Sequence, residues 1–116
     1  MSALAARRLA LAFAAAGLLL VGVGLATAEE RVEPRRHTIT IEGNAFRPDD
    51  LTVDRGDTVV WINRDFYPHT ATDTEGRFDS GTIPANDSWA LTVEASGELR
   101  YICTLHPTMK ATLRVR

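Results

Sequence analysis

The sequence predicts a small all-β domain, an antiparallel sandwich or barrel, behind an N-terminal signal peptide. Two observations predict the β class: apolar and polar residues alternate in six short runs, and turn-forming residues separate these runs. Outside the N-terminal segment, no window has a convincing helical period. With 116 residues, the chain has room for one domain and a targeting segment.

The N-terminal segment, residues 1–28, has the three parts of a secretory signal peptide. Arg7 and Arg8 provide the charged region, an apolar run follows over residues 9–26, and Ala26-Thr27-Ala28 resembles a cleavage site. The run is also nearly long enough for a retained membrane anchor, and the two arginines leave twin-arginine export open. We expect export to a bacterial periplasm, with no stable membrane insertion after cleavage.

The remaining elements follow in chain order. Residues 29–36 are polar and contain proline, which predicts a flexible lead-in, and the domain is expected over residues 37–116. The runs that predict strands are residues 38–41, 51–53, 58–62, 89–93, 99–103 and 111–115. Turn formers separate them at residues 43–44, 55–57, 84–87 and 96–97. Five aromatic residues are expected to fill much of the core: Phe46, Trp61, Phe78, Trp89 and Tyr101.

Composition excludes several classes of function. The formal net charge is −2, so the chain lacks the basic footprint of a nucleic-acid-binding protein. The one cysteine cannot form an internal disulfide or a zinc finger, and three histidines are too few for a multi-centre metalloenzyme. A hydrophobic content of 45% also excludes general disorder.

The residues with metal-binding chemistry lie in the loop predicted between the last two strands. Cys103, His106 and Met109 are spaced at intervals of three residues, so their side chains can face one point in a tight turn. A thiolate, an imidazole and a thioether together suit copper, because soft sulfur stabilises Cu(I) and nitrogen satisfies Cu(II). A lone cysteine or methionine is more often a buried apolar residue, and the pattern by itself is weak.

A histidine elsewhere in the chain strengthens the copper prediction. His69 follows a predicted strand, where Pro68 would hold the chain in a defined turn. Two histidines and a cysteine in one plane, with a distant axial methionine, make the blue-copper arrangement. The chain supplies this set once. His37, in the lead-in to the first strand, is expected to be a surface residue.

Taken together, these features resemble the cupredoxins, most closely the amicyanin-like and plastocyanin-like small blue copper proteins. The resemblance covers residues 38–116 and includes the short, amicyanin-type gap between His106 and Met109. It implies a Greek-key β-sandwich and one copper ion, with His69, Cys103, His106 and Met109 as ligands. The matching segments are Phe46-x-Pro48, Leu51-x-Val53, Gly56-Asp57-x-Val59-x-Trp61-x-Asn63-x-Asp65, Pro68-His69, Phe78-Asp79-Ser80-Gly81 and the Cys103 loop.

Three positions depart from the pattern of these proteins. Thr70 stands where asparagine often follows the first ligand histidine, and its hydroxyl is expected to bond near Thr104 in the Cys103 loop. Ala111 stands where glycine is common. Leu105 stands where amicyanins have proline, which has no N–H, and its backbone N–H is expected to donate to the Cys103 sulfur. Thr70, Thr104 and Leu105 are therefore expected to support the ligands.

The resemblance implies a type 1 blue copper protein that carries single electrons in the periplasm. It would be a monomer that meets redox proteins, such as a cytochrome c or a dehydrogenase, in brief contacts of modest area. The expected electron-transfer surface consists of His106, Pro107, Leu105 and Tyr67. Phe66 could either join an apolar rim on this surface or close the end of the core.

Other classes of function are also considered. A periplasmic protein that binds and delivers copper is the main alternative, since it too would need methionine, histidine and export. An enzyme is not expected, because a Cys/His nucleophile pair would need an orienting base and a substrate cleft. Copper oxidases and nitrite reductases would need additional histidine-rich copper centres, and His37 is the one unassigned histidine.

Overall fold

The structure, a computed structural model, describes residues 12, 14–22, 24 and 33–116. The predicted signal peptide, residues 1–28, lies largely outside the described residues, as does the first half of the predicted lead-in. Residues 12, 14–22 and 24 are in neither helix nor strand. Within the described segments there is no helix with the length and apolar character needed to span a bilayer.

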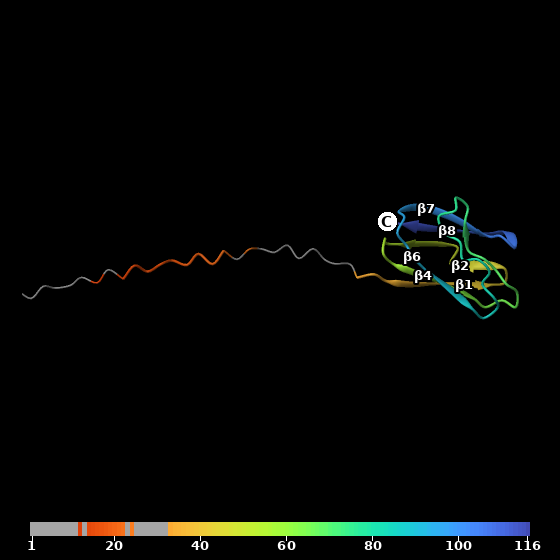
Figure 1. Cartoon of the computed structure of the whole chain (residues 1–116), viewed down its shortest axis with the longest axis horizontal. Coiled ribbons are helices and arrows are strands. Elements are labelled where there is room, and N and C mark those ends of the chain that lie inside the picture. The colour runs from red at the N-terminus through yellow and green to blue at the C-terminus, as the bar shows by residue number, and fades with distance from the viewer. Residues whose placement is uncertain (1–11, 13, 23, 25–32) are drawn as a thin grey trace, which may run out of the picture. The chain divides into compact units, whose positions relative to one another are not determined.

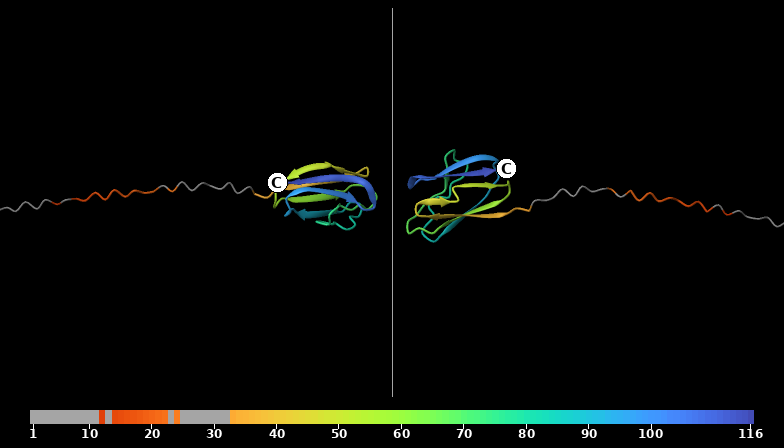
Figure 2. Two further views of the ribbon diagram at one scale, coloured as in Figure 1. Left: turned by 90° about the horizontal axis from the view of Figure 1, so that it is seen from above. Right: turned by 180° about the vertical axis from the view of Figure 1, so that it is seen from behind.

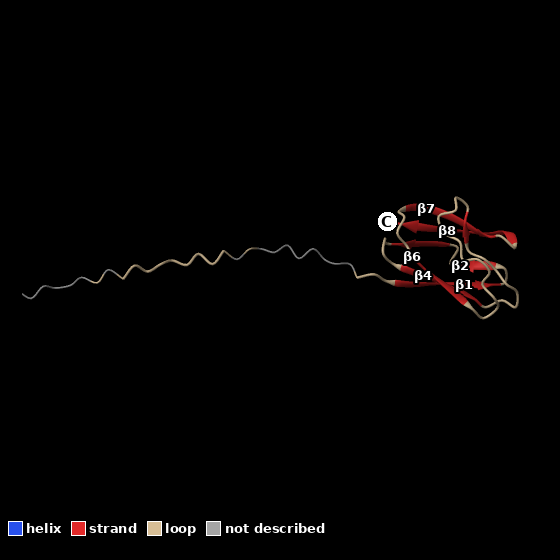
Figure 3. Ribbon diagram, in the orientation of Figure 1, coloured by secondary structure: helices blue, strands red, loops and turns tan. Residues whose placement is uncertain are grey.

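Residues 33–116 form an all-β domain, as predicted (Figures 1 and 3). Its strands are joined by turns and loops, and one four-stranded sheet lies against another (Figure 2). The strands are β1 (Arg36–Glu42), β2 (Ala45–Arg47), β3 (Asp50–Val53), β4 (Thr58–Asn63), β5 (Thr72–Asp73), β6 (Ser88–Thr92), β7 (Gly97–Cys103) and β8 (His106–Val115).

The strand order is that of a Greek-key sandwich in which the chain repeatedly changes sheet. One sheet has the order β2-β1-β4-β6 and the other the order β3-β8-β7-β5. β1 pairs with β4, and β3 with β8, in parallel, whereas the other neighbours are antiparallel. The sandwich is therefore not purely antiparallel, because each parallel partner is reached through the opposite sheet and not through a hairpin.

All six predicted runs overlap strands, but the boundaries differ at the start of the domain. β1 begins at Arg36, so the irregular lead-in ends at Arg35, one residue before the predicted boundary. β2 and β5 have three and two residues, too short for alternation to reveal them in the sequence.

Aromatic side chains fill the space between the two sheets. Phe46, Trp61, Phe78 and Tyr101 are buried, and Trp89 is partly buried against them. The rings of Phe46 and Tyr101 meet edge to face with centroids 4.7 Å apart. Cys103 and Met109 belong to the same buried cluster, so the core continues to the turn between β7 and β8.

The domain has two ends that differ in what they contain (Figure 1). The start of β1 and the C-terminus lie at one end, called here the terminal end. The turn between β7 and β8 lies at the opposite end, called here the hairpin end. β1 and β4 run in parallel between the two, from the pair Arg36 and Thr58 to the pair Ile41 and Asn63.

Candidate metal centre

An irregular hairpin presents the residues of the Cys103 loop. Cys103 pairs directly with His106, so Thr104 and Leu105 alone make the turn between β7 and β8. The register shifts at this point, because Ile102 pairs with Lys110. Residues 107–109 therefore have no partner in β7, and such an irregularity bends a strand and changes the direction of its side chains. This irregularity places Cys103, His106 and Met109 next to the β7–β8 turn.

His69 comes from the loop between β4 and β5, which the backbone holds in place. The N–H of His69 donates to the carbonyl of Ile83 at 3.1 Å, and the N–H of Ile83 donates back at 2.7 Å. The side-chain amide of Asn63 donates to the carbonyls of Tyr67, at 2.7 Å, and Ile83, at 3.0 Å. This clamp fixes a fully buried histidine next to the hairpin.

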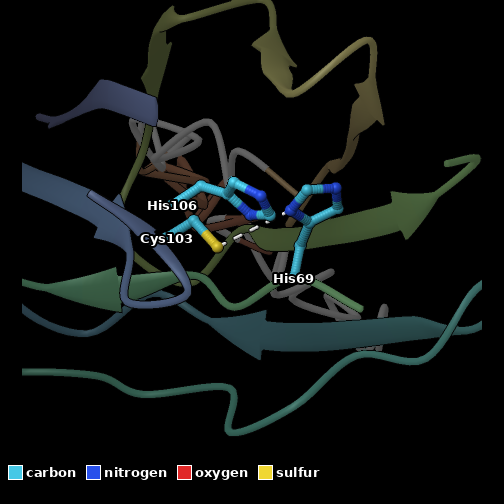
Figure 4. Close-up of side chains that lie close together, drawn as sticks. All are labelled: His69, Cys103 and His106. Carbon is cyan, nitrogen blue, oxygen red and sulfur yellow. Dashed lines mark hydrogen bonds between the residues drawn. The ribbon is translucent and has the colours of Figure 1, made fainter. Parts of the chain in front are cut away.

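The structure brings His69, Cys103 and His106 together (Figure 4). One potential ligand atom from each lies within 4.8 Å of the others, and His69 Nδ1 is 3.6 Å from Cys103 Sγ. Met109, on β8, is buried in the core cluster that also contains Cys103. These are the four side chains that the sequence predicted as copper ligands.

The two histidine rings each offer a nitrogen that suits a metal ion. His106 Nδ1 is buried and has no hydrogen-bond partner among the described residues, a state that is costly for a polar atom. His69 Nδ1 faces the cysteine sulfur. Two imidazole nitrogens, a thiolate and a nearby thioether are a donor set for copper, so the residues present fit this metal.

Thr70 connects the two segments that supply the cluster. Its backbone N–H donates to Cys103 Sγ at 3.3 Å. Its hydroxyl accepts a hydrogen bond from the N–H of Thr104 at 2.9 Å and lies 3.1 Å from the Thr104 hydroxyl. The hydroxyl contact expected near Thr104 is thus present in the structure.

The donor to the cysteine sulfur is not the one expected from the sequence. The expectation for Leu105 is not met, because Thr70, not Leu105, supplies the backbone N–H donor to Sγ among the described residues. The reason is tertiary: β5 pairs with β7 through Thr72 and Ile102, which places Thr70 beside Cys103. At Ala111, where glycine is common in related proteins, the strand continues without a positive φ.

Asp65 bonds to the side of the His69 ring away from the sulfur. Its Oδ2 lies 2.8 Å from His69 Nε2, and its two oxygens accept the N–H groups of Gly43, at 2.7 Å, and Asn44, at 3.0 Å. Burial alone would raise the pKa of the Asp65 carboxyl, but the hydrogen bonds from Asn44, Gly43 and His69 outweigh it. The pKa of this carboxyl is therefore below its ordinary value. The sequence alone assigns Asp65 no role, because a spacing of four residues predicts no contact within a loop.

Exposed apolar side chains flank the clustered histidines in the sequence. Phe66, Tyr67 and Leu105 are 94%, 65% and 51% exposed, Pro107 is exposed, and His106 is half-buried. The alternative in which Phe66 closes the core is wrong, since its side chain lies almost entirely in solvent.

His37 differs from the expectation for a surface residue. It lies within β1, its side chain is 22% exposed, and its Nε2 is 2.8 Å from Asp57 Oδ2. It is not part of the His69, Cys103 and His106 group. Because it is the second residue of β1, it belongs to the terminal end of the domain.

Comparison with known proteins places the whole domain among copper proteins. The sequence model for copper binding proteins of the plastocyanin/azurin family matches residues 36–116. An amicyanin from Paracoccus versutus is 27% identical over 82 residues, which cover 66% of this chain and 62% of that protein. Amicyanin-alpha from Methylorubrum extorquens is 28% identical over 116 residues, covering 91% of this chain and 98% of the relative.

Solved structures give the same result for the fold. A methionine-to-alanine variant of amicyanin in the Cu(I) state matches with a TM-score of 0.66 and 27% identity, over 70% of this chain and 82% of that one. A copper-containing nitrite reductase from Thermus scotoductus matches with a TM-score of 0.65 and 28% identity. The match covers 70% of this chain but 22% of the reductase.

Proposed function

Because this chain belongs to the plastocyanin/azurin family of copper-binding proteins, we propose that it is a type 1 blue copper protein that carries single electrons. The observation that carries the proposal is the convergence of His69, Cys103 and His106, with the buried Nδ1 of His106 lacking any partner in the described structure. A domain in which one buried cysteine meets two histidines at the end of the core is suited to hold copper in a closed site.

Each ligand has a separate role in the proposal. Cys103 Sγ and the Nδ1 atoms of His69 and His106 would hold the ion, and the Met109 sulfur would be the fourth and weakest donor. Copper, when bound, supplies the one-electron Cu(I)/Cu(II) couple. The chain keeps its ligands in place for both states: the Ile83 clamp holds His69, and the Thr70 N–H supports the Cys103 sulfur.

We propose that electrons pass through the hairpin end. The half-buried His106 stands between exposed Leu105, in the β7–β8 turn, and exposed Pro107, on β8, and exposed Tyr67 precedes His69 by two residues. Apolar exposed side chains of this kind favour brief contact with a redox protein that has a matching apolar face. A cytochrome c or a dehydrogenase is the proposed partner class, with this chain as a monomer.

The proposed location is the bacterial periplasm, after removal of residues 1–28. The support is the arrangement of charged, apolar and small residues in that segment. A protein in that compartment would meet electron-transfer partners that are themselves exported.

An electron carrier is proposed over an enzyme, although a nitrite reductase is among the similar structures. This chain covers 22% of that reductase. In the part of the chain that the structure describes, the side chains suited to a metal ion form one group, which supports a single copper and not a multi-centre enzyme.

The test is the spectrum and voltammetry of the purified, copper-loaded protein. We expect an intense thiolate-to-copper absorption band and a reversible one-electron couple. Cys103→Ser should abolish the band, because an alcohol cannot supply the charge-transfer thiolate, and a melting curve of the copper-free variant controls for folding. A colourless wild type that exchanges copper readily would instead support the copper-delivery alternative.

A further inference from the structure

We propose that Asp65 is a positioning residue for the copper site: it fixes the His69 ring through Nε2 and lowers the reduction potential with its negative charge. The inference rests on the ligand set of the proposed function. It adds a residue that does not touch the metal ion itself.

The first step is the orientation of the His69 ring. The ring is fully buried, with Nε2 2.8 Å from Asp65 Oδ2 and Nδ1 3.6 Å from Cys103 Sγ. An ionised carboxylate can only accept a hydrogen bond, so the ring hydrogen is on Nε2. The lone pair of Nδ1 is then free, and it points toward the cysteine sulfur. Carboxylates often fix the tautomer of a metal-binding histidine in this way.

The second step is that Asp65 is itself held by the turn between β1 and β2, which lie in the same sheet as β4. Gly43 and Asn44, between β1 and β2, have φ values of 61° and 54°, and both direct their N–H groups at the carboxylate. Successive N–H groups in such a turn form a concave anion site. The Asp65 N–H is also bonded to Asn63 Oδ1 at 3.0 Å. Asp65 therefore transmits the position of the β1–β2 turn to His69.

The third step is electrostatic. Within the described residues, the ion-pair partner of Asp65 is His69, and the Asp65 side chain is 13% exposed. Its charge is thus neither paired with arginine or lysine nor fully screened by water. Cu(II) has one more positive charge than Cu(I), so a nearby carboxylate stabilises Cu(II) more and lowers the potential.

The chain contains a matched control for this inference. Asp57, at the terminal end, accepts hydrogen bonds from two backbone N–H groups, those of Arg35 and Asp54, and its Oδ2 is 2.8 Å from His37 Nε2. The bonding is the same as at Asp65, but His37 is outside the metal-binding group. Asp57→Asn removes an equivalent carboxylate without touching the copper ligands.

The experiment compares wild type, Asp65→Asn, Asp65→Glu and Asp57→Asn, each loaded with copper. Asp65→Asn should weaken Cu(II) affinity about 10- to 100-fold, the usual cost of losing such a partner. With Cu(I) affinity unchanged, each tenfold loss raises the potential by about 59 mV. Asp65→Glu, which keeps the charge, should return the potential toward the wild-type value. Asp57→Asn should leave the potential and the spectrum as in wild type.

A measurement on the wild type keeps the inference open to refutation even where a variant folds poorly. Nitrogen NMR of the copper-free full chain should show His69 with its hydrogen on Nε2. A hydrogen on Nδ1, or an Asp65→Asn potential equal to that of Asp57→Asn, would overturn the inference. Absence of a blue band in the wild type would instead refute the proposed function, while the NMR result would still decide whether Asp65 orients His69.

Discussion

The two ends of the sandwich contain the same hydrogen-bonded unit with different surroundings. At each end an aspartate accepts two backbone N–H groups and lies 2.8 Å from a histidine Nε2: Asp65 with His69 at the hairpin end, Asp57 with His37 at the terminal end. The histidine side chains are 0% and 22% exposed, respectively. The other ring nitrogen of His69 faces a cysteine sulfur, whereas His37 is outside the metal-binding group.

The difference shows that an aspartate–histidine contact does not by itself make a functional site. Asp57 ties the residue before β1 to the turn before β4, and so joins two parallel strands where they begin. Asp65 ties the loop after β4 to the turn after β1, where the same strands end. The unit joins the two strands at both ends, and the proposed metal ligand lies at the end where the second ring nitrogen meets Cys103.

The largest expected difference between the ends is in copper binding. His69→Ala removes a proposed ligand. Loss of a residue that only hydrogen-bonds to a ligand costs up to about 100-fold in metal affinity, so loss of the ligand itself should lower the Cu(II) affinity by more than this. The blue band should weaken or disappear. His37→Ala should bind copper as wild type does, in a competition titration with a chelator. Equal losses in the two variants would contradict the assignment of the site to the hairpin end.

The next effect concerns electron transfer to a partner. Leu105→Glu places an unpaired charge on the exposed apolar surface at the hairpin end. We expect burial of this charge against the partner to cost about 1.4 kcal/mol of binding free energy, which weakens the complex about tenfold. Stopped-flow rates with a redox partner should fall by about this factor, with the blue spectrum unchanged. Ala95→Glu, an exposed site in the loop before β7, is the control. If both variants transfer electrons at the wild-type rate, Leu105 lies outside the docking face.

A smaller effect is expected on thermal stability at the terminal end. Asp57→Asn replaces one carboxylate oxygen with an NH2 group, which cannot accept a hydrogen bond, so a backbone N–H of Arg35 or Asp54 loses its partner. The melting temperature should fall by several degrees, with and without copper, in a calorimetric scan. An unchanged melting temperature would mean that water replaces the lost contacts at no cost.

The smallest expected effect is in the acid dependence of stability. The backbone N–H of Arg35, the His37 ring and the N–H of Asp54 lower the pKa of Asp57 from 3.8 to about 2. A carboxyl whose pKa is lower in the folded state than in the unfolded state stabilises the fold at pH values above its unfolded-state pKa. This stabilisation is lost as the pH falls through the folded-state pKa. Urea unfolding between pH 4 and pH 2 should show a shallower loss for Asp57→Asn than for wild type. Parallel curves would indicate that Asp57 does not contribute in this window.

The sequence by itself determined the β class, the six longer strands and the identity of the four clustered side chains. Alternation reveals a strand when one face is buried over several residues, as in β1 and β7. It cannot reveal β5, which has two residues. Cys103, His106 and Met109 could be grouped because they lie within seven residues, and metal-binding side-chain types are readable without coordinates.

Only the tertiary structure decided which distant groups meet. Pairing of β5 with β7 gives the sulfur its hydrogen bond from Thr70 and not from Leu105. The parallel pairing of β1 with β4 brings Gly43 and Asn44 to Asp65, more than twenty residues along the chain, and Asp65 in turn lies 2.8 Å from His69 Nε2. Hydrogen bonds depend on distance and direction in space, and strand pairing, not local spacing, sets both between segments far apart in sequence.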